Sequence, residues 1–224
     1  MVLGDLLKNT DTVVIAADLE IDVTGISFDT RTLRAGELFV AIKGFEQDGN
    51  IFIEEAAAKG AVCVICVKAP GAPIPYVLVE DPRIALATVS AAWFKHPASG
   101  LITVGVTGTN GKTTVTSLIK QVIEKCVGAK VGLIVTNSNM IGDRELFTER
   151  TTPESYEIQK LLRLMADEGC HYVVMEVSSH ALQLGRVHGI EFEVGIFTNL
   201  SPDHLDFHSS MNDYADTKIG RAHV

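Results

Sequence analysis

The stretch 101–114 reads LITVGVTGTNGKTT, in which an apolar run at 101–106 leads into a glycine-rich loop. The apolar run predicts a buried strand, and the residues that follow at 112–125 predict a helix. Glycines let backbone N–H groups approach a phosphate closely, and the start of a helix adds the positive end of its dipole. The stretch therefore predicts a nucleotide-binding P-loop in an α/β protein. The expected nucleotide contacts are Gly108, Thr109, Asn110, Gly111, Lys112, Thr113 and Thr114.

Two side chains of the loop have expected roles. Lys112 should reach the β- and γ-phosphates of ATP, and the Thr113 hydroxyl should bind Mg²⁺. The general pattern G-x-x-x-x-G-K-[ST] places its first glycine at position 106, which is Val106 here, while Gly105 comes one place too early. An ordinary glycine turn is the alternative interpretation. The strand before the loop and the helix after it favour the P-loop.

Working outward, strand-like and helix-like segments alternate on both sides of the loop. This rhythm predicts a parallel sheet covered by helices. The segment 95–100 is a compact linker, so we expect an N-terminal domain at 1–98 and a central domain at 99–218. The other expected strands lie at 38–42, 61–67, 76–79, 130–135, 172–177 and 193–197. The other expected helices lie at 51–59, 82–94, 153–168 and from 210 onward.

Two more polar segments follow predicted strands. Glu176 ends the apolar strand at 172–177, and the segment 198–208 is rich in Asn, Asp and His. Ligand sites of parallel sheets lie at the carboxyl ends of strands, so Glu176 is a candidate ligand of Mg²⁺. The alternative is a strand-end carboxylate that faces water. For 198–208, ligand contact and a purely structural role remain equally open.

Composition restricts the function classes. Apolar residues make up 46% of the 224, and the formal net charge is −9, which argues against a nucleic-acid surface. No apolar run is long enough for a membrane span, and the N-terminus has no signal-like segment, so we expect a cytoplasmic protein. Cys63 and Cys66 have CxxC spacing within an apolar run and lack a second pair, which indicates core thiols rather than a metal site.

Together these segments resemble the Mur ligases, which build the peptide of peptidoglycan. The resemblance extends to the N-terminal residues Asp29-Thr30-Arg31, to 36–41 and to Asp48-Gly49, and also to 175–182. The N-terminal motifs are those of the tripeptide-forming branch of the family. The resemblance implies a uridine-binding α/β domain, a P-loop central domain and a third domain.

The resemblance also implies roles for individual residues. The uridine nucleotide would be held by Thr30, Phe45, Glu46 and Gln47. The muramoyl dipeptide would be held by Thr151, Thr152, Ser178 and Arg186. The catalytic and metal-binding set would be Lys112, Thr113, Glu176, His204 and Lys218, with Lys218 carbamylated to help His204 hold a second Mg²⁺. Three positions depart from the family pattern: Thr30 replaces Ser, Arg150 replaces Asn and Leu184 replaces Gln.

The implied reaction is ATP-dependent. An acyl phosphate forms on the D-glutamate of UDP-N-acetylmuramoyl-L-alanyl-D-glutamate, and the amine of meso-diaminopimelate or L-lysine displaces the phosphate. A monomer without nucleic-acid or membrane partners is expected. By the resemblance a third domain should follow position 218, so we expect this chain to lack that domain and to be inactive alone, and we expect 219–224 to be a non-native tail. The alternatives are another Mur-type or folylpolyglutamate-type ligase, and a P-loop protein that is not a ligase.

Overall fold

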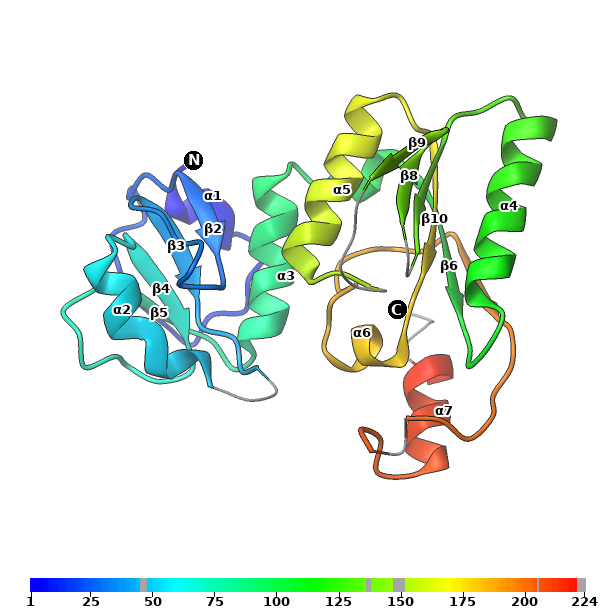
Figure 1. The fold of residues 1–224 in the computed structure, drawn as a ribbon. Helices are drawn as coiled ribbons and strands as arrows, with labels where there is room; N and C mark the ends of the chain where they lie inside the picture. The colour runs from blue at the N-terminus through cyan, green and yellow to red at the C-terminus, as the bar shows by residue number, and fades with distance from the viewer. Residues whose placement is uncertain (45–47, 136–137, 147–151, 205, 221–224) are drawn as a thin grey trace. The chain divides into compact units, whose positions relative to one another are not determined.

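The computed structural model describes residues 1–44, 48–135, 138–146, 152–204 and 206–220 (Figure 1). The chain forms two compact units, Met1–Lys95 and His96–Val224. Four of the predicted substrate residues lie outside the described residues, namely Phe45, Glu46, Gln47 and Thr151. The end of the expected tail, 221–224, also lies outside them.

The first unit is a five-stranded sheet in the order β1-β5-β4-β3-β2. All neighbouring pairs are parallel except β1 with β5. The strands are β1 (Val14–Ala16), β2 (Gly25–Ser27), β3 (Glu37–Val40), β4 (Cys63–Cys66) and β5 (Tyr76–Leu78). The helices are α1 (Leu3–Leu7), the 3₁₀ turn η1 (Gly49–Phe52), α2 (Ile53–Ala58) and α3 (Pro82–Trp93).

Local chemistry explains two features of this unit. The Asp81 side chain accepts hydrogen bonds from the N–H groups of Arg83 and Ile84, which fixes the start of α3 with Pro82 in its first turn. Cys63 and Cys66 are free thiols with no exposed surface, and burial raises the pKa of Cys63 to about 12. The interpretation of this pair as core thiols is confirmed.

The second unit is a six-stranded sheet in the order β11-β6-β10-β7-β8-β9. The first four strands in this order are parallel, and β8 and β9 add an antiparallel hairpin. The strands are β6 (Ile102–Thr107), β7 (Val131–Ile134), β8 (Asn139–Ile141), β9 (Arg144–Leu146), β10 (Tyr172–Glu176) and β11 (Val194–Phe197). The helices are η2 (Pro97–Gly100), α4 (Lys112–Cys126), α5 (Ser155–Asp167), α6 (Ser179–Gln183) and α7 (Met211–Gly220).

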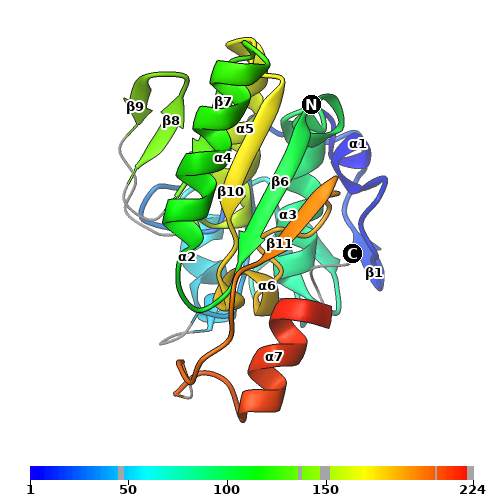
Figure 2. The ribbon, with the colours of Figure 1, turned by 90° about the vertical axis from the view of Figure 1, so that its right-hand side faces the viewer.

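Alternate residues of β10 face opposite layers, as the two-residue period of a strand requires. Val174 packs in the apolar cluster that includes Val115 and Ile119 of α4. Val173 packs in the cluster that includes Ile158 of α5. The two helices therefore cover opposite faces of the parallel strands, and Figure 2 shows α4 in front of them. This arrangement leaves the carboxyl ends of β6, β10 and β11 at one rim of the sheet.

The predicted α/β architecture is confirmed, although the sequence prediction lacks α1, β1 and β2 of the first unit and differs at further elements of the second. The hairpin β8–β9 and the short helix α6 are absent from the sequence prediction. Helix α5 begins at Ser155 rather than at Pro153, because Glu154 and Glu157 form a capping box there. None of the described helices combines the length and the apolar character that crossing a membrane requires.

Candidate active site

The glycine-rich loop connects β6 to α4 through two left-handed glycines. Gly108 has φ +140° and Gly111 has φ +83°. A Cβ on Gly108 would lie 2.0 Å from Thr198 Oγ1, so only glycine fits there. Gly105 has another function: its Cβ would lie 2.9 Å from the Phe192 ring, so its small size serves packing within the sheet. Gly108 is therefore the first glycine of the functional loop.

The segment after β11 holds the loop in place. The Asn110 N–H donates to Asn199 Oδ1 at 3.0 Å, and Asn199 Nδ2 donates back to the Asn110 carbonyl at 3.0 Å. Thr198 Oγ1 donates to the same carbonyl at 2.7 Å. The Thr109 N–H donates to the Asn199 carbonyl at 2.9 Å, and the Ser201 N–H donates to Thr109 Oγ1 at 3.0 Å. These contacts join residues about 90 positions apart, so the motif alone does not reveal them.

Two predicted lysines meet at one carbonyl of the loop. Lys112 Nζ donates to the carbonyls of Gly108 at 2.9 Å and Thr109 at 2.8 Å. Lys218 Nζ, from α7, donates to the Gly108 carbonyl at 2.8 Å. Lys218 is 1% exposed although it is a lysine. Lysine side chains are rarely fully buried, because burying the ammonium costs desolvation free energy. A buried lysine beside the phosphate loop is therefore a functional candidate.

The pKa values of the two lysines report their surroundings. Burial lowers the pKa of Lys112, while the negative charges of Glu176 and Asp203 oppose this shift. Burial also lowers the pKa of Lys218 to about 8, with a further contribution from the charge of Lys112. Glu176 lies opposite Val106 in the β10–β6 register and is 1% exposed. The structure therefore brings Lys112, Glu176 and Lys218 to the same rim.

Tyr214 of α7 contacts both the phosphate loop and Lys218. Its hydroxyl lies 3.1 Å from Thr109 Oγ1, and Lys218 Nζ lies 4.8 Å from its ring centroid. The His204 ring lies 6.3 Å from the Tyr214 ring and 4.9 Å, edge-on, from that of His180. Sequence analysis missed Tyr214 and His180. The four-residue spacing of Tyr214 from Lys218 on one helix face was the signal available.

The side chains at the rim are compatible with a Mg²⁺ ion that arrives with a nucleotide. Among the described residues, no group of three His, Cys, Asp or Glu could hold a metal ion. Mg²⁺ commonly binds one or two carboxylates together with phosphate oxygens, so Glu176 and the Thr113 hydroxyl suffice for such a site. As an ammonium, Lys218 donates to Gly108 and offers no lone pair, so a second site with His204 would require the carbamate.

A second polar cluster contains three of the residues predicted to hold the dipeptide. Ser178 caps α6 by accepting from the Ala181 N–H at 3.1 Å, and Thr152 Oγ1 lies 3.3 Å from Ser178 Oγ. Arg186 Nη1 donates to the Thr152 carbonyl at 3.0 Å, and Arg186 Nε donates to Glu154 Oε1 at 3.1 Å. Glu154 was not among the predicted residues, although the spacing of Glu154 and Glu157 could have predicted the capping box. Its pairing with Arg186, 32 positions away, was not readable.

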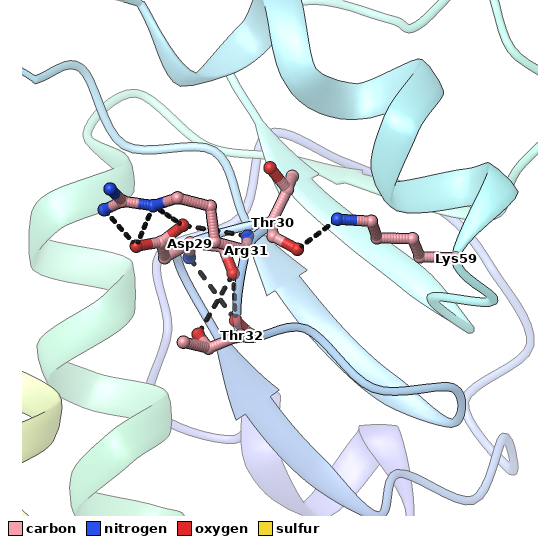
Figure 3. A network of polar contacts seen from close by, with 6 residues as sticks. Asp29, Thr30, Arg31, Thr32 and Lys59 are labelled. Atoms are coloured by element: carbon pink, nitrogen blue, oxygen red, sulfur yellow. Dashed lines mark hydrogen bonds and ion pairs between the residues drawn. The ribbon is translucent and has the colours of Figure 1, made fainter.

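Thr30 lies in the first unit, three residues after the end of β2 (Figure 3). Lys59 Nζ donates to the Thr30 carbonyl at 2.8 Å. Beside it, the Arg31 guanidinium pairs with the Asp29 carboxylate and holds the pKa of Asp29 below its usual range. The Thr30 side chain points away from this ion pair in Figure 3. Thr30 belongs to a different unit from the phosphate loop, Lys112 and Lys218.

Comparison with known proteins gives a consistent picture. Residues 106–220 match the Mur ligase middle domain, and residues 22–95 match the catalytic domain of the Mur ligase family. The UDP-N-acetylmuramoyl-L-alanyl-D-glutamate–2,6-diaminopimelate ligase of Caldanaerobacter subterraneus subsp. tengcongensis is 48% identical over 97% of this chain and 45% of its own length. The ligase of that name from Clostridium tetani is 45% identical over 98% of this chain and 46% of its own length.

Solved structures agree. A structure of UDP-N-acetylmuramoyl-L-alanyl-D-glutamate–2,6-diaminopimelate ligase superposes with a TM-score of 0.81 at 27% identity and covers 97% of this chain and 44% of that protein. The UDP-N-acetylmuramoylalanyl-D-glutamyl-2,6-diaminopimelate–D-alanyl-D-alanyl ligase from Acinetobacter baumannii shares the fold, with a TM-score of 0.65 at 19% identity, and the match covers 100% of this chain and 46% of that protein. The chain thus spans about half the length of these relatives. On the match to its middle domain, the chain belongs to the Mur ligase family.

Proposed function

We propose that this chain carries the uridine-substrate and ATP-binding parts of a ligase that adds meso-diaminopimelate to UDP-N-acetylmuramoyl-L-alanyl-D-glutamate. The observation that carries the proposal is the convergence of Lys112, Glu176 and Lys218 at the phosphate loop. The names of the relatives that cover this chain from end to end support the choice of substrate and of diaminopimelate over lysine. A cytoplasmic monomer is part of the same proposal.

The proposed reaction must overcome the repulsion between two negatively charged groups. A substrate carboxylate must approach the γ-phosphate of ATP, and two unit charges about 4 Å apart repel by roughly 4 kcal/mol at an effective dielectric near 20. The loop answers this with the Lys112 ammonium and with the N-terminal end of α4. Mg²⁺, held by Thr113 and Glu176, would supply further stabilisation of the phosphate charge. Lys112 would leave the Gly108 and Thr109 carbonyls to reach the phosphates.

The remaining predicted residues would position the acceptor substrate. Arg186 is held by Glu154 and the Thr152 carbonyl, so its planar guanidinium is oriented before any substrate arrives. Thr152 and Ser178 would offer hydroxyls to the muramoyl dipeptide. Thr152 Oγ1 lies 3.4 Å from the Glu176 carbonyl, which places this cluster beside the end of β10. In the first unit, Thr30 would contact the uridine nucleotide, together with Phe45, Glu46 and Gln47.

The second candidate function is that of a folylpolyglutamate-type ligase or another P-loop protein. The match of residues 22–95 to the Mur ligase family favours the proposed function, because neither alternative requires a uridine-substrate unit. Calorimetric titration of the 224-residue chain should therefore show saturable binding of UDP-N-acetylmuramoyl-L-alanyl-D-glutamate, and folate should not compete. Binding of folate, or binding of ADP without any binding of the uridine substrate, would contradict the proposal.

A further inference from the structure

The backbone N–H groups of residues 109–114 in the phosphate loop fall into two sets. The first set, at Thr109 and Asn110, donates within the protein, to the Asn199 carbonyl at 2.9 Å and to Asn199 Oδ1 at 3.0 Å. The second set, at 111–114, lies at the start of α4. A helix leaves its first N–H groups without an intrahelical acceptor, and the cap residue Gly111 has no side chain to supply one. Of the N–H groups at 109–114, those of the second set are therefore left for a ligand.

Asn199 is the residue that separates the two sets of N–H groups. The Asn199 amide pairs with both polar groups of the Asn110 peptide, accepting from its N–H and donating to its carbonyl. Asparagine is suited to this task because its amide carries a donor and an acceptor side by side. Thr198 Oγ1 adds a third contact to the same carbonyl. The orientation of the Asn110 peptide is thus fixed before a phosphate arrives.

We propose that Asn199 is a positioning residue of the phosphate loop, which occupies the N–H groups of Thr109 and Asn110 and confines phosphate to the N–H groups of 111–114. This inference rests on the proposed binding of ATP at the loop. It assigns Asn199 no contact with the nucleotide. It also refines the seven-residue contact set expected from the motif, because two of its backbone donors are already used.

Residue-resolved amide hydrogen exchange tests the proposal on the 224-residue chain with ADP as the probe. Without nucleotide, the Asn110 amide should exchange at least about tenfold more slowly than an unstructured amide. Added ADP should slow exchange at 111–114 and leave Thr109 and Asn110 unchanged. Fast exchange of the Asn110 amide in the free chain, or slowing at Asn110 equal to that at Gly111, would overturn the proposal.

Two variants separate positioning from general destabilisation. Asn199→Ala removes the acceptor, so the Asn110 amide should lose its protection and ADP affinity should fall about tenfold. Asn199→Asp keeps the acceptor, so the Asn110 amide should stay protected. Asn212→Ala, at an exposed position of α7, is the matched control and should change neither property. Unchanged Asn110 exchange in Asn199→Ala would overturn the proposal. If ADP binds nowhere on the wild-type chain, the nucleotide assignment fails, while exchange in the free chain still decides the role of Asn199.

Discussion

The phosphate loop and the turn at Asp29–Thr32 both follow a strand, but different kinds of contact hold them. Around the loop, the partners come from far along the chain, as with Asn110 and Asn199, 89 positions apart, or Gly108 and Lys218, 110 positions apart. In the turn, Arg31 pairs with Asp29 two positions away, while Lys59 and Glu55 contact Thr30 from further along the chain. The loop is therefore shaped by the whole unit, whereas the turn is largely shaped by its own sequence.

The largest effect should come from Gly108→Ala. The new methyl group would collide with Thr198 Oγ1, and alanine resists a φ of +140°, so the two costs together should lower the free energy of unfolding by roughly 4 kcal/mol. ADP binding should become undetectable by calorimetry. Gly128→Ala is the control, because Gly128 has φ +70° with open space around it and should lose only about 1 kcal/mol. Equal losses in both variants would mean that the contact with Thr198 is unimportant.

A comparable distant contact can be broken at Arg186. Arg186→Met removes the guanidinium that pairs with the buried Glu154 carboxylate, so denaturant unfolding should show a loss of about 3 kcal/mol. Binding of the uridine substrate should weaken as well. The control is Arg163→Met, which breaks a local ion pair on the surface of α5 with Asp167, four positions away. A denaturation midpoint for Arg186→Met that matches the control would show that this long-range pair contributes nothing.

Lys218 offers a smaller effect that depends on pH. Its folded pKa of about 8 lies below the ordinary lysine pKa of 10.5, so the unfolded chain binds more protons between these values and stability rises with pH across that window. From pH 7 to 9 the unmodified wild type should gain about 1 kcal/mol relative to Lys218→Met. Lys125→Met, at an exposed position, should run parallel to the wild type. A constant difference between wild type and Lys218→Met would rule out the depressed pKa.

The smallest effect should come from the local turn. Arg31 is 86% exposed, and exposed ion pairs contribute little, so Arg31→Ala should shift the thermal midpoint by no more than about 2 °C. Lys59→Met removes a hydrogen bond that reaches this turn from 29 positions away and should shift the midpoint more. Scanning calorimetry of both variants decides the order. A larger shift for Arg31→Ala would reverse the contrast between the two regions.

The same contrast explains what sequence analysis could achieve. The βα rhythm, the loop and Glu176 were predictable, because strand alternation, glycine spacing and strand ends are local signals. The capping of α5 by Glu154 was missed although its signal was local. Asn199 and the pairing of Glu154 with Arg186 were not readable, because hydrogen bonds across the fold leave no pattern along the chain. Gly105 comes one place too early for the loop pattern, and its role in packing against Phe192 was not readable from the sequence.

The most direct test concerns the carboxylate at the end of β10. ADP affinity of the 224-residue chain is measured by calorimetry with and without Mg²⁺, for the wild type and for Glu176→Gln. If polyphosphate and metal meet beside Lys112 and Glu176, Mg²⁺ should tighten ADP binding in the wild type, and this gain should vanish in Glu176→Gln while metal-free affinity stays similar. An equal gain from Mg²⁺ in both proteins would contradict the account.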